Sequence, residues 1–480
     1  MSANRIITLG KDTVVYGFGG IVSKFLNIFL LPVLTRLFSV EEFGTIDLIA
    51  LIITFFNAVC ILGMDSAIGV YYFEQDTDEK KKSFFSSYFW TATVSSAAFA
   101  LIGILLAPYF AQAVLKDPQL VGVFRIACLT IPATIIFQAL ITLSRFQFRP
   151  KAYNLLVILN VALNVVLAIL LVKYLSMHIV GIFWARVIAA SFIIAGALVF
   201  QFQNIGLGIS GEKVKRLVLY GLPLIPLALI TYASNAMGRY FLKFYWTDFE
   251  IGKYAFAVKI SAICGVAFTA FNLAFLPYAS KLRFEGDFHE TVNKIVKLFL
   301  FVSGALILFL YSLSNPLIRI FGTREYLTCE PFMVLGMLAL FLNAAYQIFN
   351  IGVCYAKKTV YITISQGAAV LTNLVSNFVL VPHYGVLGAF MSLIISLVLA
   401  NLTILGISQS VYPIRYQTQK IVELFMLIVF IGVASFWVRD PFLKLAILMT
   451  YGIWGLSVRK YITLPNISEF GVRLQNIKDG

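Results

Sequence analysis

Charged side chains are scarce in this sequence. Only 12% of its 480 residues are Asp, Glu, Lys or Arg, and 60% are hydrophobic, whereas a soluble globular protein has about 25% charged residues. The shortage excludes a soluble globular domain. Apolar stretches of about 20 residues recur from end to end, and each is long enough to cross a bilayer as a helix. We therefore expect an all-α integral membrane protein.

Residues for several other kinds of chemistry are scarce too. The five cysteines are odd in number and four lie in apolar runs, which indicates small core residues and not a disulfide framework or metal site. The three histidines form no metal-binding motif. Residues 206–213 resemble a phosphate-binding loop, but Glu212 stands where that loop needs lysine, so we expect a cytoplasmic connector. With no cluster of acids and no nucleophile beside a base, we expect no catalytic residues and no enzyme.

The apolar runs between polar breaks predict about fourteen membrane spans. Their approximate limits are 11–38, 44–73, 84–107, 122–143, 153–172, 180–202, 219–244, 252–275, 295–313, 332–355, 361–381, 386–408, 421–438 and 442–458. The tail before the first span has no apolar region with a small-residue cleavage site, so we expect no removable signal peptide.

The distribution of cations predicts the orientation of the chain. With an even number of spans both termini share one side, and 23 of the 37 Lys and Arg residues lie in the tails and loops of that side. Because cations favour the cytoplasmic side, both termini are expected to be cytoplasmic. The formal charge of +15 then reflects mainly topology, and we expect no nucleic-acid partner.

A long internal repeat links the two halves of the sequence at an offset of about 205 residues. The aligned pairs are Tyr16 with Tyr220, Gly17 with Gly221, Gly44 with Gly252, His178 with His383, and Gly181 with Gly388. A six-span unit returns the chain to its starting side, so the two copies have the same orientation. We therefore expect a six-helix bundle at 1–210, a second at 211–412, and two additional helices with a cytoplasmic tail at 413–480.

Lys24 lies near the middle of the first expected span. At about 1.5 Å per residue it is about 18 Å from either end of that span, whereas a lysine side chain reaches only about 6 Å. Facing lipid would cost from about 3 to more than 10 kcal/mol. Lys24 shares a helix face with small residues and Asn27, which favours a water-filled cavity. A buried pair with Asp65, or a polar network, is the alternative.

Three more cations lie within spans, namely Arg186, Arg239 and Lys259. They are nearer the outer ends, so each either lines a cavity or extends to the interface. Asn235 precedes Arg239 by one helical turn, and Asp65 is a counter-ion, a proton carrier or a folding contact. An excess of cations within the spans favours an anionic cargo.

Four segments give the sequence a family resemblance: "KFLNIFLLPVLTRLFSVEEFG" from Lys24, "GMDSAIGVYYFE" from Gly63, "YGLPLIPLALITYASNAMGRYFL" from Tyr220 and "EIGKYAFAVKIS" from Glu250. They resemble the Wzx-type polysaccharide and O-antigen flippases of the multidrug, oligosaccharidyl-lipid and polysaccharide (MOP) exporter superfamily. Such proteins often have Asp-Arg in the seventh span, where this chain has Gly238 before Arg239. The chain therefore has no acidic neighbour for Arg239 at that position.

The resemblance implies a bacterial inner-membrane carrier of undecaprenyl-pyrophosphate-linked oligosaccharide that works by alternating access. Lys24, Arg186, Arg239 and Lys259 would attract the anionic head group, and Asn27, Asp65 and Asn235 would add polar or ion-coupling groups to the cavity. No cofactor is expected apart from coupling to an H⁺ or Na⁺ gradient. Membrane lipids, a polysaccharide polymerase and a chain-length regulator are the other expected partners.

Two other readings stay open. One is a small-molecule exporter or a lipid II flippase of the same fold, although an exporter of cations should have an acidic cavity. The other is a membrane glycosyltransferase, ligase or polymerase acting on the same lipid, which should have larger outer loops.

Overall fold

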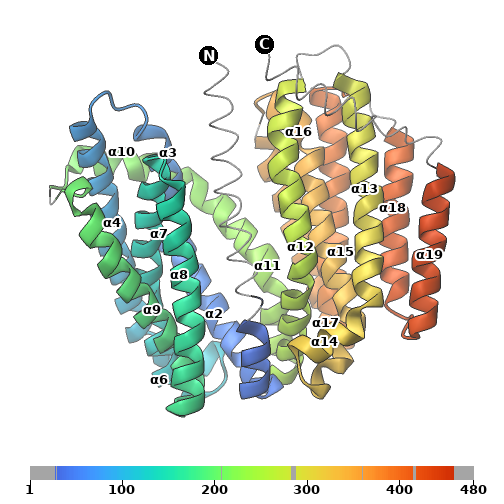
Figure 1. Ribbon diagram of the computed structural model, residues 1–480, viewed down its shortest axis with the longest axis horizontal. Coiled ribbons are helices and arrows are strands. Elements are labelled where there is room, and N and C mark those ends of the chain that lie inside the picture. The colour runs from blue at the N-terminus through green and yellow to red at the C-terminus, as the bar shows by residue number, and fades with distance from the viewer. Residues whose placement is uncertain are drawn as a thin grey trace. The chain divides into compact units, whose positions relative to one another are not determined.

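The structure is a computed structural model, and it describes residues 28, 30–206, 208–282, 288–358, 360–414 and 418–458. Every regular element in that part of the chain is a helix (Figure 1), which confirms the expected all-α class. The described residues form two compact units, one ending at Ala255 and the other starting at Phe256. Helix α12, Asp248–Leu282, runs from the first unit into the second.

The first unit contains helices that pack both on the next helix in sequence, as α8 does on α9, and on more distant ones, as α4 does on α7. They are α2 (Val40–Cys60), α3 (Met64–Tyr71), α4 (Asp78–Leu105), α5 (Ala107–Tyr109), α6 (Val121–Cys128), α7 (Thr130–Phe146), α8 (Pro150–Ile169), α9 (His178–Gln201), α10 (Gly211–Gly221) and α11 (Ile225–Tyr245). Short π or 3₁₀ segments adjoin them at η1 (Phe110–Val114), η2 (Pro118–Leu120), η3 (Leu170–Tyr174), η4 (Phe202–Asn204) and η5 (Leu222–Leu224). Helices α10 and α11 also pack on α3 and α2.

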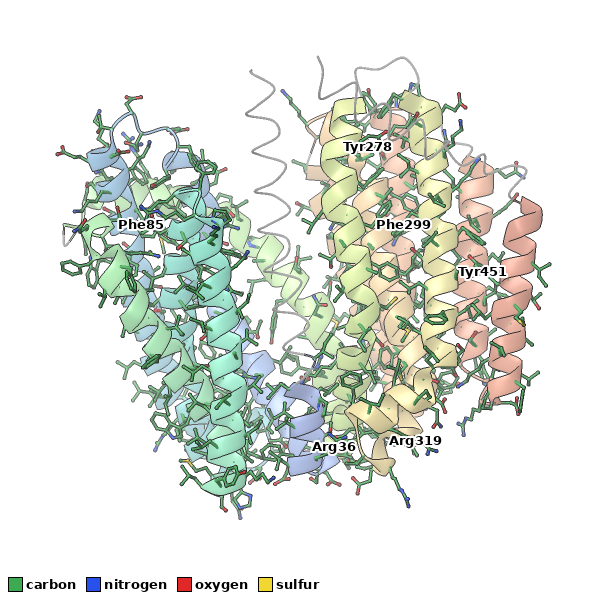
Figure 2. The ribbon with its side chains drawn as sticks, viewed as in Figure 1. Arg36, Phe85, Tyr278, Phe299, Arg319 and Tyr451 are labelled. Atoms are coloured by element: carbon green, nitrogen blue, oxygen red, sulfur yellow. The ribbon has the colours of Figure 1, made fainter. Side chains whose placement is uncertain are left out.

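The second unit continues α12 and places α13, α15, α17, α18 and α19 beside one another (Figure 1). Its elements are α13 (Phe288–Ser312), α14 (Ser314–Phe321), η6 (Arg324–Cys329), α15 (Glu330–Phe349), α16 (Ile351–Tyr355), α17 (Val360–Val411), α18 (Thr418–Ser435) and α19 (Pro441–Val458). Figure 2 marks Tyr451 on α19, whose hydroxyl donates to the carbonyl oxygen of Phe301 on α13 at 3.2 Å.

Side-chain caps fix where several helices begin. At the start of α2, the Ser39 hydroxyl accepts from the amide of Glu42 at 3.2 Å, and the Glu42 carboxylate accepts from the amide of Ser39 at 2.9 Å. Thr77 caps α4, and the carboxylate of Asp440 caps α19. These oxygens satisfy backbone amides that the first turn of a helix leaves without a partner.

The second expected span, 44–73, is two helices in the structure. Helix α2 ends at Cys60, and the chain turns through Leu62 and Gly63, whose φ angles are 52° and 66°. Glycine adopts this left-handed region without strain. A Cβ atom on Gly63 would overlap the backbone of Gly221, so the turn also needs glycine for close packing. Asp65 consequently lies in the first turn of α3, in a separate helix from Asp47.

Gly44 and Gly252, which the repeat aligns, pack against each other in the first unit. A Cβ atom on Gly44 would lie 2.7 Å from the amide nitrogen of Gly252, and one on Gly252 would overlap the carbonyl oxygen of Val40. Equivalent positions in contact are what a twofold relation between copies produces. The contact supports the repeat, while the boundaries at 210/211 and 412/413 stay predictions.

The number of spans is only partly resolved by the described residues. Nine of their helices are long and apolar enough to cross a membrane, or ten if the bent pair Gly211–Leu224 and Ala228–Tyr245 is one span. Helix α17 covers two expected spans, which meet at a bend at Gly385, where φ is 53°. Residues 11–27 and 29 of the first expected span lie outside the described residues, so fourteen stays a prediction.

Four of the five cysteines are buried, as expected for small core residues. Cys60, Cys128, Cys264 and Cys329 are buried free thiols, whereas Cys354 is an exposed free thiol. Within the described ranges no three His, Cys, Asp or Glu side chains are grouped closely enough to hold a metal ion.

Candidate functional site

Arg239 is a buried cation on α11, with only 9% of its surface exposed. Its Nε donates to Oδ2 of Asp47 at 2.6 Å, and its Nη1 donates to the carbonyl oxygen of Asn235 at 2.8 Å. The ring of Tyr254 on α12 lies 5.2 Å from the guanidinium carbon. A buried charge is tolerated when it is paired and hydrogen-bonded, and these three contacts provide that compensation.

The acidic partner of Arg239 is Asp47, which lies on α2 and is 192 residues earlier in the chain. Its surface is 8% exposed. The local sequence around Arg239 does not predict Asp47 as its partner, because the adjoining position holds Gly238. One signal was available, since Asp47 is a single acid in the apolar run of α2, and such residues are costly unless they have a partner.

Arg186 is a second cation that acts on the same carboxylate. It lies half-buried on α9, with its guanidinium carbon 5.6 Å from the centre of the Phe183 ring. The charge of Asp47 acts on Arg186. Asp47 on α2 is thus paired with Arg239 on α11, and its charge also acts on Arg186 on α9.

Three tyrosines complete this group. The hydroxyls of Tyr232 and Tyr240 on α11 lie 2.7 Å apart, and the charge of Arg239 acts on both. Tyr254 is the third. We use the name arginine–aspartate cluster for the set that lies on α2, α9, α11 and the start of α12: Asp47, Arg186, Tyr232, Arg239, Tyr240 and Tyr254.

The arginine–aspartate cluster carries two positive charges and one negative charge. One more anion can therefore pair there without leaving an uncompensated buried cation. Guanidinium groups suit phosphate because their planar N–H donors match two oxygens at once. The cluster is thus chemically suited to a phosphate-type head group.

The other expected site residues lie elsewhere or cannot be placed. Asn235 is exposed, and its side chain donates to the carbonyl one turn earlier in α11. Asp65 is exposed on α3. It follows the end of α2, and that end is about 20 Å from Asp47 along the helix at about 1.5 Å per residue. Lys259 is half-buried on α12 in the second unit. Lys24 and Asn27 lie outside the described residues, and the cavity role of all these residues stays a prediction.

A separate buried ion pair lies in the second unit. Lys444 on α19 donates to Oε1 of Glu330 at 2.5 Å and to the hydroxyl of Ser314 at 3.1 Å, and that hydroxyl donates to Glu330 at 2.6 Å. The Tyr311 ring lies 4.2 Å from the ammonium. The contacts join α13, α14, α15 and α19, and the charges of Lys444 and Glu330 offset each other within 2.5 Å, so we assign them to structure.

The fold is shared with known membrane transporters. The structure of "Lipid II flippase MurJ, inward closed conformation" matches 94% of this chain and 100% of its own, with a TM-score of 0.73 and 14% identity. An inward-facing multidrug resistance MATE family transporter of the MOP superfamily matches 88% of this chain and 99% of its own, with a TM-score of 0.61 and 13% identity. The chain is a multi-pass membrane protein with the MOP transporter fold.

The family is set by the sequence. A family model described as "Polysaccharide biosynthesis protein" matches residues 33–331, and the chain belongs to this family. A protein of the Lsg locus of Haemophilus influenzae is 24% identical over 282 residues. That match covers 56% of this chain and 65% of the relative, so the chain spans about two thirds of the relative's length. The expected polysaccharide-biosynthesis family is confirmed, and the fold is the one that known MOP transporters have.

Proposed function

We propose that the chain is a flippase for an undecaprenyl-pyrophosphate-linked oligosaccharide, such as an O-antigen, capsule or exopolysaccharide repeat unit. Its family supports a role in polysaccharide biosynthesis, and its fold supports transport. The observation that carries the proposal is the arginine–aspartate cluster, in which Asp47 is paired with Arg239 and its charge also acts on Arg186. Such a site suits the anionic part of a lipid-linked sugar.

The diphosphate and the sugars are the parts of this cargo that cross the hydrocarbon of the bilayer only with the aid of a protein. Charges at the bilayer centre are costly. A charge pair about 4 Å apart at an effective dielectric constant of about 20 is worth about 4 kcal/mol before desolvation. The prenyl tail has no such requirement, because hydrocarbon is its natural solvent.

The remaining parts of the proposal follow from the sequence. The carrier would work by alternating access between two six-helix bundles in the bacterial inner membrane, with both termini in the cytoplasm. Lys24 and Lys259 would add positive charge along the path. An H⁺ or Na⁺ gradient would drive export, and a polymerase with its chain-length regulator would receive the repeat units.

Deletion of the gene tests the proposal in the cell. Lipid-linked glycan should accumulate in the inner leaflet. A membrane-impermeant glycan label added to intact spheroplasts should therefore fail to reach it, and the wild-type gene should restore labelling. Accumulation of unjoined repeat units in the labelled outer leaflet would instead identify a polymerase or ligase. Unchanged glycan with a loss of drug resistance would identify a small-molecule exporter, and arrest of peptidoglycan synthesis would identify a lipid II flippase.

Single substitutions test the site. Arg186→Gln should abolish export while the protein remains in the membrane, because the Asp47–Arg239 pair is retained. Lys24→Ala should do the same if Lys24 lines the path. Arg216→Gln is the matched control, since Arg216 forms an exposed pair with Glu212 on α10. Normal export by Arg186→Gln would contradict the role of the cluster.

A further inference from the structure

We propose that Asp47 is an internal counter-anion, which occupies Arg239 in the empty protein and is displaced by the diphosphate of the cargo. This inference rests on the proposed function and adds a mechanism for loading and release. In the structure the carboxylate of Asp47 accepts from Nε of Arg239 at 2.6 Å. An incoming phosphate needs the same donor.

The burial of the pair explains why a resident anion is useful. Asp47 and Arg239 are 8% and 9% exposed, and a buried cation without a partner is strongly unfavourable. Asp47 keeps the empty site stable, and it returns to Arg239 when the cargo leaves. A site with two unpaired arginines would be less stable when empty and would release its anion more slowly.

The net charge around the two arginines falls from +1 to zero in the exchange, counted with Asp47 before it and with the diphosphate after it. With Asp47 in place, the cluster has an excess of one positive charge from Arg186 and Arg239. A diphosphate diester carries one negative charge on each phosphate. When the diphosphate replaces Asp47, each arginine gains one phosphate, and the carboxylate moves away from a filled anion site because like charges repel.

The exchange also has a mechanical consequence. Asp47 lies on α2 and Arg239 on α11, and these helices pack against each other in the first unit. Their ion pair ties the two helices together in the empty state. Displacement of Asp47 releases that tie only when cargo is bound, so it couples arrival of the head group to movement of α2 against α11.

Binding measurements on the purified full chain in nanodiscs test this, with farnesyl diphosphate as the probe. Asp47→Asn should bind the probe roughly tenfold more tightly than wild type or better, because a competing buried charge is removed. Arg239→Gln should lose binding, and so should the double variant Asp47→Asn/Arg239→Gln, which removes both members of the hydrogen-bonded pair and so leaves neither of them buried without the other. Arg216→Gln should bind as wild type does.

The probe has two controls. Farnesol tests the prenyl chain without charge, and inorganic pyrophosphate tests the anion without lipid. If wild type does not bind farnesyl diphosphate above farnesol, the proposed function fails. If wild type binds it but Asp47→Asn binds equally or more weakly, the proposed function survives and Asp47 is only a structural partner. Equal affinity for inorganic pyrophosphate would identify a free anion, not a lipid head group, as the ligand.

A measurement on wild type alone covers the case in which Asp47→Asn does not fold. A hydrophobic carbodiimide reacts with buried carboxyl groups, and mass spectrometry locates the modified residue. Saturating farnesyl diphosphate should increase modification of Asp47, because its carboxylate leaves Arg239, whereas farnesol should not. Unchanged or decreased modification of Asp47 would overturn the inference.

Discussion

Replacement of Lys444 by methionine removes one charge from the buried pair of the second unit. The side chains of Lys444 and Glu330 are 3% and 14% exposed, and their charged atoms lie 2.5 Å apart. The change leaves the Glu330 carboxylate with only the hydroxyl of Ser314. Removal of one partner from a buried pair costs about 3–5 kcal/mol, mainly because the other charge is left uncompensated.

The double variant shows whether that cost belongs to the pair. Glu330→Gln alone should also destabilise the chain by about 3–5 kcal/mol, because it leaves Lys444 buried without a carboxylate. Lys444→Met/Glu330→Gln has no uncompensated charge, so its loss of stability should be smaller than the sum of the two single losses by more than the larger of them. The same logic predicts that the double variant is more stable than either single variant.

Thermal unfolding of the purified chain in detergent measures the effect. A thiol-reactive fluorogenic dye reports unfolding, because Cys264 and Cys329 of this unit are buried. Lys294→Met is the matched control, since its i,i+4 pair with Glu290 has side chains that are 34% and 72% exposed, and exposed pairs contribute only about 0–1 kcal/mol. Equal midpoints for Lys444→Met and Lys294→Met would refute the reasoning, as would a double variant less stable than both single variants.

Two further substitutions probe close contacts in the first unit. Gly252→Ala should lower the unfolding temperature clearly, because the new methyl group would overlap the carbonyl oxygen of Val40, whereas Gly122→Ala has open space and should have little effect. Trp90→Phe removes the hydrogen bond from the indole nitrogen to the carbonyl oxygen of Gly206, which is 2.9 Å long and worth about 0.5–1.5 kcal/mol. A broad-specificity protease should then cut the connector at Gly206 faster than in wild type, and equal cleavage rates would show that this bond does not hold the connector.

The two buried ion pairs differ in what surrounds the charges. Lys444 and Glu330 balance each other, and Ser314 and Tyr311 fill the remaining contacts. Asp47 has two arginines acting on it, so its neighbourhood keeps a positive excess. A balanced pair suits a structural joint, whereas an excess of one sign suits a site that receives an ion of the opposite sign.

Composition and spacing alone predict that the chain lies in a lipid bilayer, that it is helical, and which residues are most costly to bury. Lipid allows only structures that satisfy their own backbone hydrogen bonds, so long apolar runs with few charges predict helices. The cost of placing a charge in lipid likewise singles out Arg186 and Arg239 as residues that need a partner or an aqueous cavity. The repeat also aligned Gly44 with Gly252, and the structure places those two residues in contact.

The pairing of the buried charges is visible only in the tertiary structure. Asp47 and Arg239 are 192 residues apart, and their contact depends on the rotation of α2 and α11 about their axes, which composition and spacing do not specify. The turn at Leu62 and Gly63, which separates Asp65 from α2, likewise follows from close packing against α10. Local sequence governs whether a helix forms in the membrane, whereas helix packing governs which of its buried charges find partners.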